Sequence, residues 1–290
     1  MACSTTGYTG QNYCNRNSRF GKPTGLIFAT DEHTNTAADF LLEATWINDV
    51  QNEKVFPLHY MKNFEDLSTE AAYYDYPDGS RKRMDQGRYR FAAHFDLNEC
   101  IKKQLVNFRG NQDGIYMVYG DVIRGRTIDS GVNIVPIRLL DVNIEKETLP
   151  GMDAPGMVRV VIDLEDHKDL NEYDYSREMT WDVSDLDGLT EVTITQVTAS
   201  ATTLVVDVTA DCGGDNKPIT GLGTETTDWK MSDGDGTITG VTESTTVNGR
   251  YTLTGTAFAT GELDLAEPED RSDDVLVISS GPATITVTES

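Results

Sequence analysis

Asp129-Ser130-Gly131 is the triplet that carries the catalytic aspartate in aspartic proteases. Those enzymes need two such aspartates facing each other, because the two carboxyl groups share one proton. This chain has one copy, so only a homodimer could supply the second aspartate. Aspartate and glycine also favour a tight turn between strands, which explains the triplet without any chemistry. The turn is the favoured interpretation.

Other groups that could hold a metal also have simpler explanations. Asp233-Gly234-Asp235-Gly236 could bind calcium weakly, but its glycine spacing and the missing distal glutamate depart from the EF-hand pattern, and a hairpin turn explains it. His33, His59, His94 and His167 have no histidine or cysteine at ligand spacing. The chain also lacks a nucleophile elbow, a phosphate-binding glycine loop and a zinc-protease helix. We therefore expect no enzymatic activity, no cofactor and no metal site.

Arg81-Lys82-Arg83, followed by Arg88 and Arg90, is the one basic cluster in an acidic chain. It could contact nucleic acid, or it could form a subunit contact in which a positive hairpin meets a negative neighbour. The second interpretation fits the overall charge better. Head-to-tail contacts of this kind that close give rings, and stacked rings give tubes. The cluster therefore predicts a subunit interface.

The charge is distributed unevenly along the 290 residues, whose net charge is −24. Residues 1–185 hold 20 Lys and Arg against 30 Asp and Glu, whereas residues 186–290 hold 4 against 18. This change predicts a domain boundary near residue 185. So acidic a chain cannot gain much affinity from phosphates, which disfavours avid binding to nucleic acid or to an anionic membrane.

No run approaches the roughly 18 apolar residues of a membrane helix, and the polar N-terminus lacks a signal-peptide core, so we expect a soluble protein made in the cytosol.

Residues 1–24 predict an extended N-terminal arm, rich in small polar residues. A frayed terminus is one interpretation. Tyr8, Tyr13 and Phe20 are costly to leave in water, however, so an arm that docks on a neighbouring subunit is the alternative. Both remain open, and the second adds these three aromatic residues to the predicted interface.

Residues 25–185 predict a mixed domain of about eight strands and two helices. The best helix signal covers about 37–51, with Thr36 as N-cap, and places Asp39, Glu43 and Asp49 on the solvent side. A second helix is expected from Asp96 to residue 108. The remaining strands are predicted at 26–29, 54–59, 69–76, 88–97 and 173–181, and Pro57 marks an edge or a bulge.

The stretch 114–164 predicts an antiparallel meander on which this domain packs. Apolar residues alternate along it with period two, so each strand should have one buried face and one that is less buried. Turn residues separate the runs.

Residues 182–189 predict a short acidic linker, after which threonine, valine and glycine dominate. About seven short strands separated by turns follow in residues 186–290, which is typical of an immunoglobulin-like β-sandwich. The whole chain is thus expected to be mainly β, with some α: an antiparallel sandwich or barrel with two short helices, then the acidic sandwich.

Residues 20–185 resemble a phage tail-tube protein. The resemblance lies in the order of an N-terminal arm, a helix, a long strand pair with a Pro77-Asp78-Gly79 turn, a second helix and a meander, and in the stretch GRYRFAAHFDLNECIKKQL, where a strand enters a helix. The acidic immunoglobulin-like module also resembles those that decorate phage virion proteins.

This resemblance implies a structural virion protein that assembles in the host cytoplasm. Such subunits form hexameric rings by joining their sheets into one inner barrel, and the stacked rings form the tail tube used in genome ejection. DNA would be a passing, non-specific cargo, repelled by a negative lumen. Partners would be further copies of the chain and other tail proteins, with no membrane anchor. The basic hairpin would serve ring-to-ring contact, and the C-terminal sandwich would project outward.

Three alternatives remain. The chain could be a head decoration protein or another minor virion component. It could be a surface protein whose sandwich binds a glycan, although the missing signal peptide disfavours this. An unrecognised hydrolase using paired carboxylates is the least favoured.

Overall fold

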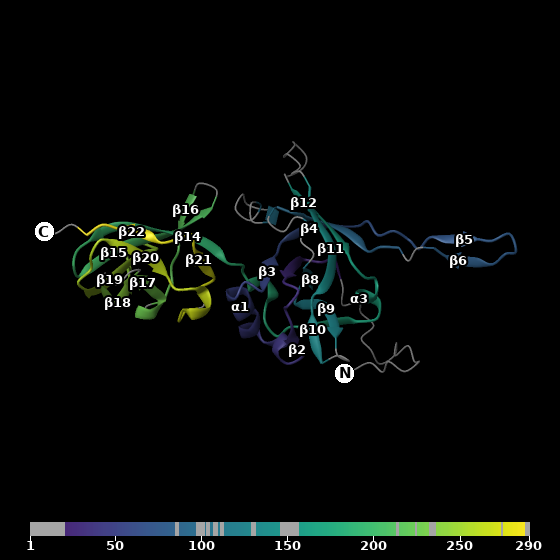
Figure 1. The fold of residues 1–290 in the computed structure, drawn as a ribbon, viewed down its shortest axis with the longest axis horizontal. Helices are drawn as coiled ribbons and strands as arrows, with labels where there is room; N and C mark the ends of the chain where they lie inside the picture. Colours follow the sequence, from purple (N-terminus) through teal and green to yellow (C-terminus); the bar gives the residue numbers. More distant parts are fainter. Residues whose placement is uncertain are drawn as a thin grey trace.

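The computed structural model confirms a mainly β protein built from antiparallel sheets with short helices (Figure 1). It describes residues 21–84, 87–96, 102, 105, 106, 110, 113–128, 132–145, 157–212, 215–223, 225–231, 236–273 and 275–287. The predictions on Tyr8, Tyr13 and Phe20, on the turns at 129–131 and 233–235, and on most of the second helix lie outside these residues.

The first domain is built on one eleven-stranded sheet. Its strands are β1 (Gly25–Ala29), β2 (Asn35–Thr36), β3 (Val55–Leu58), β4 (Met61–Asp66), β7 (Arg90–Phe95), β8 (Gly114–Tyr119), β9 (Val122–Ile128), β10 (Asn133–Val135), β11 (Ile137–Ile144), β12 (Val158–Leu164) and β13 (Asp174–Glu178). The main order is β2-β10-β9-β8-β11-β12-β7-β4; β1 also pairs with β8, β3 with β1, and β13 with β9. As Pro57 predicts, β3 lies at an edge, since β1 is its one partner in the sheet.

The predicted meander is present in part. β8, β9 and β10 follow one another as antiparallel neighbours, but β11 returns to pair with β8 through Ile137 and Ile115. The expected less-buried face is wrong for β8, because Ile115 and Met117 belong to one core cluster while Tyr116 and Val118 belong to another. The period-two pattern of β8 therefore alternates between two buried faces.

The single helix expected at 37–51 is divided in two. A 3-10 turn, η1 (Asp39–Leu41), precedes α1 (Glu43–Gln51), and Leu42 between them is extended, with φ −92° and ψ 121°. The Trp46 indole N–H donates to the carbonyl oxygen of Phe40 at 2.9 Å and ties the two pieces together. The Thr36 hydroxyl accepts the Asp39 backbone N–H at 3.2 Å, but the N-cap of η1 is Ala38 and that of α1 is Leu42, so the prediction of Thr36 as N-cap is wrong.

Asp49 is buried, with 7% of its surface exposed, so its predicted place on the solvent side of the helix is wrong. Its Oδ2 lies 2.9 Å from His33 Nε2. Hydrogen bonding to a buried side chain compensates the loss of water, which helical periodicity alone does not reveal.

The second domain packs two sheets around one core. The larger sheet contains β14 (Thr190–Ala199), β15 (Thr203–Cys212), β16 (Asp215–Pro218), β18 (Thr237–Glu243), β19 (Arg250–Thr256) and β21 (Val277–Ser279); the smaller contains β17 (Trp229–Met231), β20 (Gly261–Leu265) and β22 (Ala283–Ile285). Trp229 from the smaller sheet and Tyr251 from the larger meet in that core, 5.4 Å apart between ring centroids. The predicted sandwich is therefore present, although β14 and β21 pair in parallel.

The acidic segment between the domains packs against the first domain. It contains the 3-10 turn η3 (Val183–Asp185), and Val183 and Leu186 are buried in the cluster beneath α1. Leu276 of the second domain packs against the same cluster. The remaining short elements are α3 (Lys168–Asn171), η4 (Thr226–Asp228) and η6 (Pro268–Asp270). The predicted linker thus contributes to the first domain's core.

Candidate assembly surface: a hairpin and a pocket

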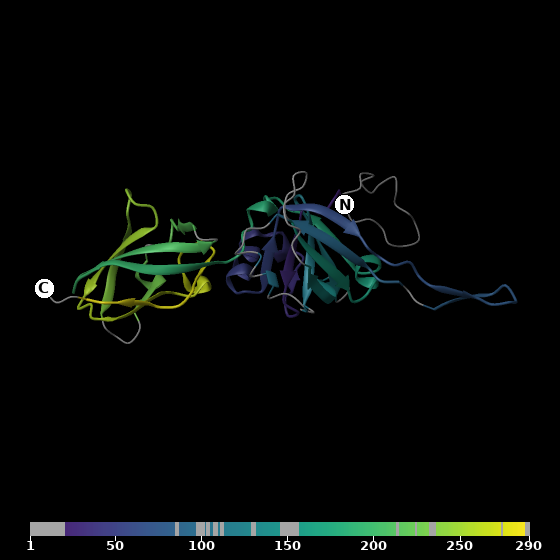
Figure 2. The same cartoon turned by 90° about the horizontal axis from the view of Figure 1, so that it is seen from above.

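A two-stranded hairpin extends from the body of the first domain (Figures 1 and 2). It consists of β5 (Tyr73–Asp75) and β6 (Arg81–Arg83), which pair only with each other among the described strands. Its turn follows from the sequence: Gly79 takes φ 81°, and the Ser80 backbone N–H donates to Asp78 Oδ1 at 2.8 Å. Glycine adopts that backbone conformation without steric cost.

The strand register divides the hairpin into two different faces. Tyr73 pairs with Arg83, Tyr74 with Lys82, and Asp75 with Arg81. Directly paired residues share a face and successive residues alternate. One face therefore carries Tyr73, Asp75, Arg81 and Arg83, and the other carries Tyr74, Tyr76, Lys82 and Met84.

On the first face, Arg81 already interacts with two other side chains of the hairpin. Arg81 Nε lies 3.0 Å from Asp75 Oδ1, and its guanidinium carbon is 4.4 Å from the centroid of the Tyr73 ring. Both partners in the ion pair are exposed, so the pair contributes about 0–1 kcal/mol. The face therefore keeps much of its charge available to another molecule.

On the second face, tyrosine and methionine side chains surround one cation, Lys82. Tyr74 is 52% exposed and Met84 65% exposed. The Tyr74 and Tyr76 rings meet edge to face, 4.9 Å apart. An isolated two-stranded hairpin is marginally stable in water, and exposed aromatic groups add to its cost. These features favour a hairpin that packs on another surface.

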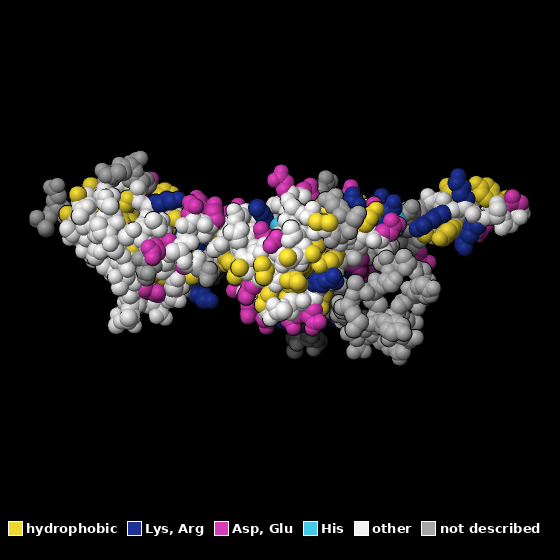
Figure 3. Space-filling view, turned by 90° about the horizontal axis from the view of Figure 1, so that it is seen from below, with side chains coloured by type: hydrophobic (Ala, Val, Ile, Leu, Met, Phe, Trp, Pro, Cys, Tyr) yellow, Lys and Arg dark blue, Asp and Glu magenta, His cyan; other side chains and the backbone are white. Residues whose placement is uncertain are grey.

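The predicted interface residues Arg81, Lys82 and Arg83 all lie on β6, behind the turn instead of at the tip. Lys82 faces away from the two arginines. Arg90, which the sequence placed in the same basic cluster, lies on β7 in the body and pairs with Asp163, 3.2 Å away. Figure 3 shows cationic and hydrophobic side chains side by side on the hairpin.

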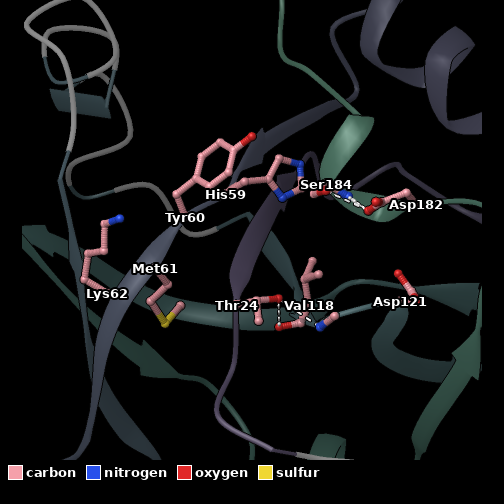
Figure 4. Close-up of a pocket in the computed structure, with 10 residues that line it drawn as sticks. Thr24, His59, Tyr60, Met61, Lys62, Val118, Asp121, Asp182 and Ser184 are labelled. Carbon is pink, nitrogen blue, oxygen red and sulfur yellow. Dashed lines mark hydrogen bonds between the residues drawn. The ribbon is translucent and has the colours of Figure 1, made fainter.

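A pocket of about 350 Å³ lies in the body of the first domain, and sequence reasoning missed it (Figure 4). It forms where β1, β4, the β8–β9 turn and η3 meet, so residues far apart in the chain line it. They are Thr24, His59, Tyr60, Met61, Lys62, Val118, Gly120, Asp121, Asp182 and Ser184. No local pattern marks such a set.

Two aspartates and one aromatic residue with a strained backbone are the notable side chains in the lining of the pocket. Asp121 and Asp182 line one side, and Lys62 lies on the opposite side (Figure 4). Ser184 donates its backbone N–H to Asp182 Oδ1 at 2.9 Å, and these contacts with Ser184 hold the pKa of Asp182 below its ordinary value. Tyr60 has φ 63°, a left-handed conformation that is unusual for a bulky residue.

His59 lies in the lining of the pocket and contacts the segment between the domains. Its Nε2 lies 2.8 Å from the carbonyl oxygen of Leu186. Burial lowers the pKa of His59, an effect that outweighs the hydrogen bond to Leu186. A neutral imidazole donating to this carbonyl links the pocket to the buried segment between the domains.

The other three histidines each lie beside a carboxylate. His33 is buried beside Asp49, His94 lies 3.1 Å from Glu65, and His167 lies 3.2 Å from Asp166. No group of three or more metal-binding side chains comes together in the part of the chain that the structure describes. The histidines therefore have structural partners.

No protein-family profile matches the chain, and a comparison with curated proteins finds no match. Among the described residues, every helix is too short or too polar to cross a membrane.

Proposed function

We propose that this chain is a structural subunit that assembles with copies of itself into stacked, hexameric rings, forming a tube of the phage tail-tube kind through which DNA passes. The hairpin is the observation that carries the proposal. It extends from the body, presents exposed tyrosines with arginine and lysine, and pairs only with itself among the described strands. Such an element gains stability when a neighbour covers it.

One border of the large sheet is open among the described strands, which supports lateral assembly. β4 lies at the end of the strand order and pairs with β7 on one side. An edge strand of this kind offers its unpaired backbone groups to another chain. Copies that pair through such edges would continue the sheet around a ring, while the hairpin would join one ring to the next.

The charge distribution supports a conduit for nucleic acid. The chain has a net charge of −24, and the basic run Arg81–Arg83 lies on the protruding hairpin. An acidic lumen would repel phosphates and let DNA slide without binding. The second domain, with 4 Lys and Arg against 18 Asp and Glu in residues 186–290, would keep particles soluble.

Replacing residues 73–83 with a short Gly-Ser turn tests this proposal. The variant should remain folded, because the hairpin contributes no residue to the described core clusters, but it should lose ring stacking. Sedimentation velocity reports the assembly, and circular dichroism and thermal unfolding report the fold. Val247→Ser is a matched control, since it removes another exposed apolar side chain, in the second domain. A folded hairpin variant that stacks like the parent would contradict the proposal.

A further inference from the structure

The second hairpin face and the acidic pocket have complementary chemistry. Lys82 is exposed on that face, and no described residue forms an ion pair with it. Tyr74 and Tyr76 flank it with exposed rings. A cation surrounded by aromatic groups on a protruding element requires a receptor that offers carboxylates and an apolar surface.

We propose that the pocket lined by Tyr60, Asp121 and Asp182 receives the Lys82 face of the hairpin from a second copy of this chain. The inference rests on the proposed function and names the surface that the hairpin contacts. The Lys82 ammonium lies between the two carboxylates, and Tyr74 packs against Tyr60.

The charges in the pocket favour such an occupant. Asp121 and Asp182 lie together on one side, and the hydrogen bonds from Ser184 lower the pKa of Asp182. Lys62 is the one cation in the lining, and it lies at the opposite side of the pocket (Figure 4). Burial lowers the pKa of His59 and so disfavours a positive charge there. A lysine that enters on the aspartate side therefore meets an unbalanced negative field.

The volume of the pocket and the exposure of Tyr60 also suit the Lys82 face of the hairpin. A volume of about 350 Å³ exceeds that of a single lysine side chain, and it leaves room for part of a tyrosine ring. Tyr60 is 67% exposed at this site, its backbone is left-handed, and its ring lies edge to face with the His59 ring, 6.3 Å apart between centroids. Strained backbone conformations of this kind persist where the surroundings impose them, often at binding sites. An exposed tyrosine beside carboxylates suits both the ammonium group and the aromatic rings of the hairpin.

The occupant has to come from another copy. The hairpin extends away from the body that contains the pocket, as the two perpendicular views agree (Figures 1 and 2). Because one end of the chain's body carries the hairpin and another part carries its receptor, the contact is head-to-tail and can repeat without limit.

A charge swap between two exposed side chains tests the inference. Lys82→Glu and Asp121→Lys should each weaken self-association about tenfold or more, because each places like charges together. The double variant K82E/D121K should recover part of the parent's association, since the pair of residues 82 and 121 is restored with reversed sign while Asp182 stays negative. Asp182 is left unchanged, because it caps η3. Glu191→Lys, an exposed reversal in the second domain, is the control for net charge and should leave association close to the parent's value.

Sedimentation velocity over a concentration series measures the association, and thermal unfolding confirms that each variant is folded. Weakening by Lys82→Glu alone, or weakening by both reversals without recovery in the double variant, would overturn the pairing while leaving assembly through the hairpin intact. Failure of the proposed function itself would appear differently, as unchanged stacking after replacement of residues 73–83.

Discussion

His33, Asn35, Asp49 and Tyr116 form a buried hydrogen-bonded group between α1 and the central strand β8. Asp49 Oδ2 lies 2.9 Å from His33 Nε2 and accepts from the Asn35 side-chain amide at 3.2 Å. His33 Nδ1 lies 2.8 Å from the Tyr116 hydroxyl. Burial raises the pKa of Tyr116, so its hydroxyl stays protonated and can donate to His33. The group anchors α1 to the sheet.

Removing the carboxylate from this group should destabilise the first domain. Asp49→Ala leaves the His33 and Asn35 donors buried without their acceptor, so we expect a loss of about 1–3 kcal/mol in the free energy of unfolding. Urea titration followed by fluorescence measures it. Asn48→Ala is the control, because Asn48 is the exposed neighbour on the same helix and alanine favours helix formation. Equal stability of the two variants would contradict the anchoring role.

Single residues were predictable from the sequence where local chemistry decides their role. The Pro77-Asp78-Gly79 turn depends on neighbouring residues, and the structure contains it. Thr36 makes its predicted local contact with Asp39, although it is not the N-cap of a helix. Asp49 was misplaced because a helical pattern assigns charged residues to solvent. Its partner His33 lies 16 positions away, so only the folded chain brings the two groups together.

The elements were predictable where the hydrophobic pattern was strong. β1, β8 and β12 follow clear apolar runs and match their predicted positions. β4 was missed, because its sequence MKNFED alternates weakly and the strand is only partly buried. The order in which β11 returns to β8 depends on packing between distant strands, and no local signal encodes it.

Because η3 packs against the first domain, it predicts where the chain can be truncated to obtain a stable first domain without the second. A chain ending after Leu189 keeps Leu186, which is 2% exposed in the core beneath α1, whereas a chain ending after Asp185 loses it. The shorter chain should be less stable by about 2–5 kcal/mol, as for other losses of a buried leucine. Chemical denaturation of both truncated chains compares the two. The docking would be refuted if their unfolding midpoints coincide.

At the scale of the whole molecule, a single chain contains an exposed hairpin, a sheet with an open edge and an acidic pocket. Each of these features could contact another copy of the chain. The composition predicted the acidic character of the second domain, because charge can be counted directly. The pocket could not be predicted, since four separate segments meet to form it. In the proposed assembly, the hairpin of one copy contacts the pocket of another.

Self-assembly into stacked rings is the central claim, and electron microscopy of the purified full-length chain tests it most directly. Negative-stain images at rising protein concentration should show rings that stack end to end into tubes, with six-fold symmetry in end-on class averages. Particles that remain single, two-domain monomers at every concentration would contradict the account.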